Sequence, residues 1–294
     1  MANARALDKR RKSIKNIRKL TRTMELIATA RYKKAMDRAA AATAYTRQIT
    51  KIVARLAAAG LDVQHPLLEP RDKVGRAVVL VLSSNRGLCG GYNGNIVRTA
   101  LPRIRDIKSS GPSVIVDAAG KRGITGLETR GYEPEQRCLH VADQPEYDEV
   151  EAIANDYLAR YITGDIDRLD VVYTKFISTS KQIATVETML PLGSIDAGDE
   201  SDDVADSGGE YEFLPSAESI LEEVVPTSFK VRLFKWFLDA AVSEQVARMI
   251  AMKGATDSAG DMIKQLSMTY NRARQSQITG ESMEIIGGVE ALEN

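Results

Sequence analysis

The first part of the chain carries one uninterrupted helical pattern, and this feature limits the possible folds more than any other. Neither glycine nor proline occurs between Ala4 and the terminal Gly60. Apolar or small residues recur there at alternating spacings of three and four, which is the heptad pattern of a coiled coil. The helix would be about 80 Å long, because an α-helix rises about 1.5 Å per residue. A small domain cannot enclose such a helix, so part of it is expected to project.

The seam of this helix contains many small residues, which would let a partner helix approach closely. Thr21, Arg31 and Arg38 interrupt the series. An ordinary long helix of a bundle is the alternative while this segment is considered alone. The residues assigned to the seam are Ile14, Ile17, Met24, Ala28, Ala35, Ala42, Tyr45, Ile49, Ile52, Leu56 and Ala59.

A second heptad pattern begins at Ser216 and runs toward the C-terminus. Pro226 marks either the start of this helix or a kink in it. An antiparallel coiled coil of the two chain ends accounts for both seams, with the C-terminal helix extending beyond the N-terminal one. We expect it to pair residues near Ala4–Gly60 with residues near Ser219–Ala291. The second seam consists of Phe234, Leu238, Ala241, Met252, Ala255, Ala259, Met262, Leu266 and Ala273.

Between the two seams the pattern changes to short apolar runs separated by helical stretches. Strands that alternate with helices predict a three-layer, Rossmann-like α/β domain with a partly parallel sheet. The predicted strands are Arg76 to Ser83, Ser113 to Asp117, Leu169 to Lys175 and Ile183 to Leu190, and the predicted helices are Ile96 to Lys108 and Glu146 to Tyr161. The expected domains are an N-terminal coiled-coil helix (1–62), the α/β domain (73–215) with an acidic, glycine-rich loop (196–212), and a C-terminal coiled-coil helix (216–294).

The charge is balanced overall but uneven along the chain. Many Lys and Arg side chains precede Gly60, whereas the stretch from Glu133 to Glu223 leans acidic. This asymmetry predicts different partners for the two regions. No run of about 18 apolar residues predicts a membrane span. The basic start lacks a secretory core, and its pattern continues through Arg55, so we interpret it as a mature helix rather than a targeting peptide.

A glycine-rich loop from Ser83 to Gly94 follows a predicted strand and precedes a helix, which is the setting of a phosphate-binding loop. Its glycines match neither Gly-x-x-x-x-Gly-Lys-Ser/Thr nor Gly-x-Gly-x-x-Gly. We therefore interpret it as a tight strand-to-helix turn, and Gly120 to Gly123 as a second such turn. The sequence predicts no direct nucleotide binding and no cofactor.

The cysteines and histidines do not form a recognisable site. Cys89 and Cys138 show neither a disulfide framework nor a paired metal spacing, which favours a reducing compartment. His65 and His140 stand alone, so no metal site is predicted. No nucleophile has an evident base partner, and we expect no catalytic residues.

The basic N-terminal helix has three interpretations. It is either a solvated charged face, a nucleic-acid-binding arm beside a coiled coil, or a shaft that meets acidic protein surfaces. Its positive residues are spread along the helix, and long apolar seams lie at both ends of the chain. Both observations favour protein packing over nucleic-acid binding.

Several motifs, found in order along nearly the whole chain, resemble the F-type ATP synthase gamma subunits of bacteria. Near the C-terminus they are AVSEQVARMIAMKGATDSAG (from Ala241), LSMTYNRARQ (from Leu266) and ITGESME (from Ile278), followed by Gly287 and Gly288. Earlier motifs are IKNIRKLTRTM (from Ile14), RGLCGGYN (from Arg86), and the segment from YTKF at Tyr173 to Leu190-Pro-Leu192. Each motif alone is weak, but together they are highly specific.

The resemblance implies a central-stalk rotor subunit without an active site of its own. Its paired terminal helices would turn inside a hexamer of alternating alpha and beta subunits, and its α/β domain would meet the epsilon subunit and the membrane c-ring. Rotation driven by proton flow would then be coupled to ATP synthesis or hydrolysis in the hexamer. The implied location is peripheral, on the cytoplasmic face of the bacterial inner membrane.

The resemblance also implies partner contacts at particular residues. Tyr211 lies in a stretch that matches the family's contact with the c-ring. Three positions depart from the family's usual residues: Glu25 replaces a basic or amide residue, Ser282 an aliphatic one and Val289 an alanine. The residues that match the rotational contacts with the hexamer are Met24, Arg248, Gln275, Thr279, Glu281 and Glu284.

Overall fold

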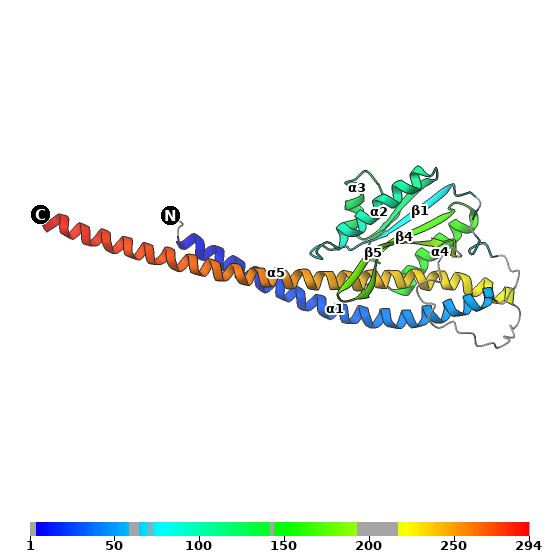
Figure 1. Cartoon of the computed structure of the whole chain (residues 1–294), viewed down its shortest axis with the longest axis horizontal. Coiled ribbons are helices and arrows are strands. Elements are labelled where there is room, and N and C mark those ends of the chain that lie inside the picture. Colours follow the sequence, from blue (N-terminus) through cyan, green and yellow to red (C-terminus); the bar gives the residue numbers. More distant parts are fainter. Residues whose placement is uncertain are drawn as a thin grey trace. The chain divides into compact units, whose positions relative to one another are not determined.

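The computed structural model describes two compact units that share two long helices (Figure 1). The helices are α1 (Ala4–Ala58) and α5 (Ala217–Glu293). The first unit comprises Met1–Thr29 and Arg248–Asn294, and the second comprises Ala30–Ala247. The residues described are 4–58, 65–69, 71, 73–141, 144–192 and 217–293, so the predicted acidic loop 196–212 lies outside them.

Both predicted terminal helices are confirmed. A segment free of glycine and proline favours the helix over its whole length, and α1 ends at Ala58, close to the predicted stop at Gly60. Pro226 lies inside α5 and does not start it. The helix begins before this proline, at Ala217.

In the first unit the two chain ends pair as antiparallel helices. The Thr256 hydroxyl donates a hydrogen bond to the Thr21 hydroxyl at 2.8 Å. The Arg11 guanidinium lies 4.8 Å from the centre of the Tyr270 ring. A contact residue earlier in α1 thus meets a residue later in α5, as antiparallel helices require. α1 begins shortly before Arg11, whereas α5 continues from Tyr270 to Glu293, so α5 extends beyond α1 as predicted.

The seam of this pair differs from the predicted one. Ile17, Met24 and Met262 are exposed and lie outside it. Thr21 and Thr256 meet inside it instead, and the Glu25 side chain is largely covered. The predicted seam residues Ala28, Met252 and Ala259 are buried there as well, while several large apolar residues point outward. A prediction that sought the seam among apolar residues was therefore wrong at these positions.

The second unit contains the predicted α/β domain, built on a five-stranded sheet of order β3-β2-β1-β4-β5. Strands β1 to β4 are parallel, and β5 pairs antiparallel with β4. Strand β3 was not predicted, because it is only two residues long. The strands are β1 (Arg76–Leu82), β2 (Ser113–Ala119), β3 (Arg137–Cys138), β4 (Arg168–Ser178) and β5 (Lys181–Leu190).

Helices cover both faces of this sheet (Figure 1). α2 (Tyr92–Ser109) and α3 (Lys121–Glu128) pack on one face. α4 (Tyr147–Thr163) and the first half of α5 pack on the other. Helix α3 was not predicted, because its glycine-rich start was interpreted as a turn.

Asp239 on α5 is a buried carboxylate in the second unit, only 7% exposed. Burial raises the pKa of Asp239 to about 6, although Lys235 opposes this rise. An unfolded aspartate titrates near about 3.9. The charged form therefore opposes folding above about pH 6, and this cost disappears as the pH falls through both pKa values.

Asp239→Asn is expected to raise the free energy of unfolding by about 1–3 kcal/mol near pH 8. The gain should shrink as the pH is lowered from about 6 toward 5, because the native aspartate then takes up a proton. Urea unfolding of both proteins across this range measures the difference. A variant that is less stable than the native chain near pH 8 would contradict this account of the buried carboxylate.

Candidate functional site

An apolar stripe runs along the outside of α1 in the first unit. It consists of Ile17, Leu20, Met24 and Ile27, whose exposed fractions are 45%, 64%, 39% and 48%. Spacings of three and four place these side chains on one face of the helix. We call these four residues the outer stripe. Regularly spaced, exposed apolar side chains of this size are typical of a surface that a partner covers.

Basic side chains form a separate row on another face of the same helix segment. Lys15, Arg18, Lys19 and Arg22 are all exposed residues of the same helix segment. Arg22 forms an ion pair of 2.7 Å with Glu25, and the other nearby acid, Asp8, is paired with Arg11 and Lys12. α1 therefore offers apolar contact area on one face and positive charge on another, and the basic face suits an acidic protein surface.

The second exposed surface is the end of α5. Every residue from Arg274 to Val289 is exposed. We call this segment the tip. The tip carries large apolar side chains that are more than half exposed, among them Ile278, Met283, Ile285 and Ile286. Such an end would be unfavourable in water unless a partner surrounds it.

Four predicted contact residues lie on the tip and are exposed there. Gln275 and Thr279 are four residues apart and share one face of the helix, whereas Glu281 and Glu284 are three apart and share another. Next to them, Gln277 Nε2 donates to Glu281 Oε1 at 2.9 Å. These polar groups therefore point in different directions around the helix, as contacts on several sides of a shaft would require.

The other predicted contact residues are placed differently. Met24 belongs to the outer stripe. Arg248 is only 8% exposed, so it offers little surface to a partner in the chain as folded. Tyr211 lies outside the described residues.

The glycine-rich loop after β1 is filled by the chain's own groups. The Ser83 hydroxyl accepts the Gly123 N–H at 2.8 Å. The Lys121 N–H donates to Asn85 Oδ1 at 3.0 Å, and the Arg122 N–H donates to the Ser84 carbonyl at 3.0 Å. The first N–H groups of α3, which could otherwise hold a phosphate, are thus capped by residues 83 to 85.

Two glycines allow this close approach. A Cβ at Gly120 would lie 2.2 Å from the Ser83 carbonyl oxygen, and a Cβ at Gly123 would lie 2.3 Å from the Ser83 hydroxyl oxygen. Gly120 also has a φ of +92°, which L-residues rarely adopt. The glycines therefore serve the contact between two loops of the chain, and their spacing needs no nucleotide to explain it.

Both cysteines have structural surroundings. Cys89 is buried, and its sulfur accepts the Asn93 amide N–H at 3.2 Å. Burial raises the pKa of the Cys138 thiol. Among the residues described, no group of three or more His, Cys, Asp and Glu side chains is placed to hold a metal ion. No helix in the described ranges is long and apolar enough to cross a membrane.

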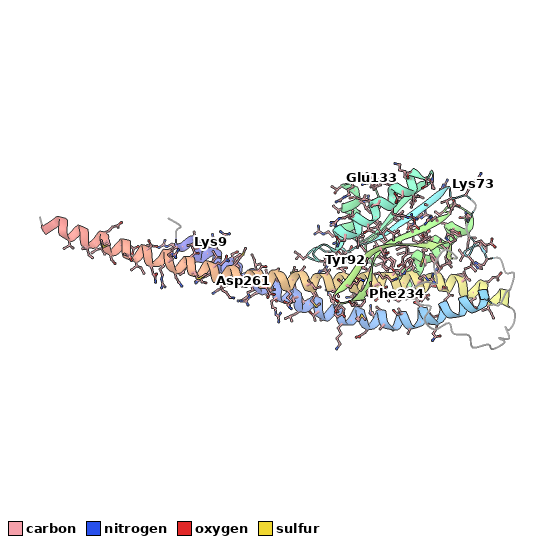
Figure 2. All side chains as sticks on the ribbon, viewed as in Figure 1. Lys9, Lys73, Tyr92, Glu133, Phe234 and Asp261 are labelled. Atoms are coloured by element: carbon pink, nitrogen blue, oxygen red, sulfur yellow. The ribbon has the colours of Figure 1, made fainter. Side chains whose placement is uncertain are left out.

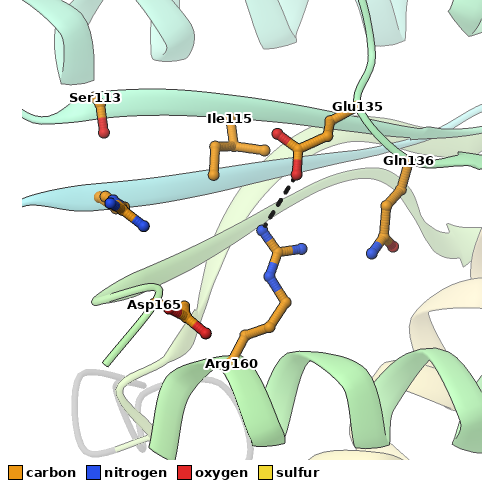
Figure 3. Close-up of a pocket in the computed structure, with 7 residues that line it drawn as sticks. Ser113, Ile115, Glu135, Gln136, Arg160 and Asp165 are labelled. Carbon is orange, nitrogen blue, oxygen red and sulfur yellow. Dashed lines mark ion pairs between the residues drawn. The ribbon is translucent and has the colours of Figure 1, made fainter. Parts of the chain in front are cut away.

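A polar pocket of about 420 Å³ opens at one end of the sheet, and its charges are balanced (Figure 3). Arg160 extends from α4 into it and lies 3.8 Å from Glu135. The same guanidinium lies 3.9 Å from buried Asp117, whose pKa is raised by burial. Arg76 and Asp165 complete a set of two cations and two anions on the lining. Arg160 therefore offsets several carboxylates, and the pocket gives no excess charge for a ligand.

Comparisons with known proteins agree across the whole length. A family model described as ATP synthase matches residues 3–292. The ATP synthase gamma chain of Rhodopirellula baltica is 79% identical, with all of both chains covered. The gamma chain of Leptospira biflexa is 37% identical and covers 99% of this chain and 100% of its own.

Solved structures show the same fold at low identity. A chain from the Euglena gracilis mitochondrial ATP synthase (OSCP/F1/c-ring) gives a TM-score of 0.65 at 18% identity, covering 98% of this chain and 94% of its own. A chain from the rotor of the same enzyme gives a TM-score of 0.62 at 17% identity, covering 94% and 98%. With the paired terminal helices, the exposed tip and the sequence match over nearly every residue, the chain belongs to the ATP synthase gamma chains, the non-catalytic central-stalk rotor subunit of that enzyme.

Proposed function

We propose that the paired ends of α1 and α5 turn inside a hexamer of alpha and beta subunits and couple rotation of a membrane c-ring to ATP synthesis or hydrolysis. The observation that carries this proposal is the exposed tip. A helix end that exposes several large apolar side chains, with polar groups on all sides, is typical of a surface that a partner surrounds. A ring of subunits is such a partner.

The two exposed surfaces support different parts of the task. The tip would be held at the axis of the hexamer by its apolar side chains. The outer stripe and the basic row lie on different faces of α1, so the surface of the helix pair is asymmetric. An asymmetric shaft makes different contacts with each catalytic interface as it turns. Those differences in contact free energy would bias the interfaces among states of different nucleotide affinity.

The α/β domain would meet the epsilon subunit and the c-ring, and Tyr211 is the proposed c-ring contact. Proton flow through the ring would supply the work, and the chemistry would occur on the beta subunits. The chain would thus be held at the cytoplasmic face of the bacterial inner membrane by its partners.

Co-purification tests this assembly. A tagged chain expressed in its own cells should retain alpha, beta and epsilon subunits after a wash at high salt, and the c-ring as well in mild detergent. Replacement of three outer-stripe residues by serine (Ile17, Leu20 and Ile27) should weaken retention of alpha and beta without loss of epsilon. Equal retention of every subunit by the variant would remove the outer stripe from the proposal.

A nucleic-acid-binding function is the alternative, because α1 is basic. It predicts filter binding that falls steeply with salt. The outer stripe argues against it, since apolar side chains at regular spacing contribute little to contact with phosphates. The absence of filter binding at low salt would exclude it.

The isolated chain is expected not to bind ATP or NAD specifically, because the loop from Ser83 to Gly94 lacks the lysine and glycine pattern of a nucleotide site and its first residues, 83 to 85, cap the N–H groups of α3. Calorimetry with each nucleotide measures this. A dissociation constant at or below about 10 μM, which corresponds to about −7 kcal/mol, would contradict the expectation.

A further inference from the structure

The two long helices are held very differently by the α/β domain in the second unit. Side chains of α5 from Val225 to Ala240 belong to the same buried cluster as the inner faces of β1 and β4. In that cluster and the one on the opposite face, the residues described include none from α1. α5 is therefore a core helix of the domain, whereas α1 lies outside its core.

Two side-chain hydroxyls tie α5 to the domain through backbone atoms. The Tyr92 hydroxyl, at the start of α2, donates to the Ala240 carbonyl of α5 at 3.0 Å (Figure 2). The Ser243 hydroxyl of α5 donates to the Thr174 carbonyl of β4 at 3.1 Å. Both bonds are buried. The two bonds therefore connect α5 to helix α2 and to the central strand β4.

Ring and ion contacts add to these ties along the same helix. The Trp236 ring stacks on Tyr173 with centroids 5.0 Å apart, and Phe234 meets Tyr147 edge-on at 5.5 Å. Lys230 pairs with Glu151 of α4 at 2.8 Å. The connection thus involves α2, α4 and β4, and close-packed interiors of this kind transmit strain with little compression.

α1 is attached mainly through α5. Its buried Ala39 packs against Leu238 and Val242 of α5. Its Tyr32 ring is tilted against the Phe176 ring of β4, with centroids 6.4 Å apart. Beside this contact, a groove of about 400 Å³ runs between α1 on one side and Lys175, Phe176 and Asp239 on the other. α1 is therefore less closely packed against the strands than α5 is.

From this asymmetry we infer that mechanical load passes between the α/β domain and the stalk through α5, with Tyr92 and Ser243 as positioning residues of the joint and α1 following α5. This inference rests on the proposed rotor function. A joint of this kind affects the enzyme only when a torque acts on the α/β domain, either driving its rotation or opposing it. Its residues should therefore affect work against a load and leave unloaded turnover unchanged.

The test compares two double variants that each remove two hydroxyls from the second unit. Tyr92→Phe with Ser243→Ala removes the ties to α5. Tyr157→Phe with Ser83→Ala removes hydrogen bonds inside the domain, to Asp117 and to the β2–α3 turn. Each variant is assembled into the whole enzyme. ATP hydrolysis by the complex without its ring, and proton-driven synthesis in vesicles, are measured at equal subunit content.

We expect unloaded hydrolysis to be unchanged in both variants, and synthesis to fall only in the joint variant. The loss should grow as the ATP/ADP ratio that opposes synthesis is raised. A third variant, Tyr32→Ala, removes the α1 contact and should retain normal synthesis. Should the joint variant fail to assemble, Tyr92→Phe alone is compared with Tyr157→Phe.

Three results would overturn the inference: normal synthesis in the joint variant, an equal loss in the Tyr157 and Ser83 variant, or an equal loss in Tyr32→Ala. In each of these cases the native chain still supports synthesis. Failure of the proposed rotor function would differ, because the native chain itself would then support none.

Discussion

Gln275→Ala combined with Glu281→Ala is expected to leave the chain folded and assembled but to lower proton-driven ATP synthesis by about tenfold. Both residues lie on the tip, where the described chain gives them almost no internal contacts. A hydrogen bond to a charged group contributes about 1.5–3 kcal/mol, and loss of about 1.4 kcal/mol at a rate-limiting state slows a reaction about tenfold. Contacts that form and break during rotation should therefore affect coupling before stability.

The measurement for this variant is paired. Thermal unfolding of the isolated subunit should be unchanged, and synthesis is compared in reconstituted enzyme at equal subunit content. Glu133→Ala, at an exposed glutamate of the α/β domain, serves as the control and should have no effect on either. Normal synthesis in the double variant would remove Gln275 and Glu281 from the contact surface. A loss of folding would show that they are structural.

Gly120→Ala is expected to destabilise the α/β domain by about 2–5 kcal/mol, because the backbone conformation costs about 1–2 kcal/mol and overpacking about 1–3 kcal/mol. The added Cβ would lie 2.2 Å from a backbone oxygen of Ser83, which cannot rotate away. Gly131→Ala is the matched control, since Gly131 has a φ of +80° but no atom within 4 Å of an added Cβ. It isolates the cost of the backbone conformation, about 1–2 kcal/mol.

Urea unfolding of the two glycine variants separates backbone strain from the steric clash with Ser83. If both variants lose the same free energy of unfolding, the contact between the Ser83 loop and the start of α3 is not tight. The glycine-rich loop would then again be open to interpretation as a ligand site.

The sequence predicts the architecture well because its signals are long or repeated. A glycine-free segment specifies α1, and apolar runs specify the three longer parallel strands. The seam of the first unit could not be placed, because Thr21 and Thr256 meet where apolar residues were expected. Helix α3 could not be recognised either, since the capping of its N–H groups by Ser83 to Asn85 joins residues distant in sequence.

The contact residues are a separate case, because they came from resemblance to a family rather than from a local pattern. Resemblance identified the residues of the tip, and their exposure is compatible with partner contact. It could not reveal that Arg248 is buried, since burial depends on packing against the rest of the fold. The outer stripe was present in the sequence, but two of its members, Ile17 and Met24, were assigned to the seam because more than one face of α1 carries apolar residues at heptad spacing.

Rotation of this chain relative to the hexamer is the most direct test of the account. Cys89 and Cys138 are buried, so a label on Lys108→Cys at the exposed surface of α2 would select the new thiol. With the alpha and beta subunits fixed to a surface, a particle attached to this thiol should turn in one direction while ATP is hydrolysed. A particle that stays at one angle while labelled complexes hydrolyse ATP at the full rate would contradict the account.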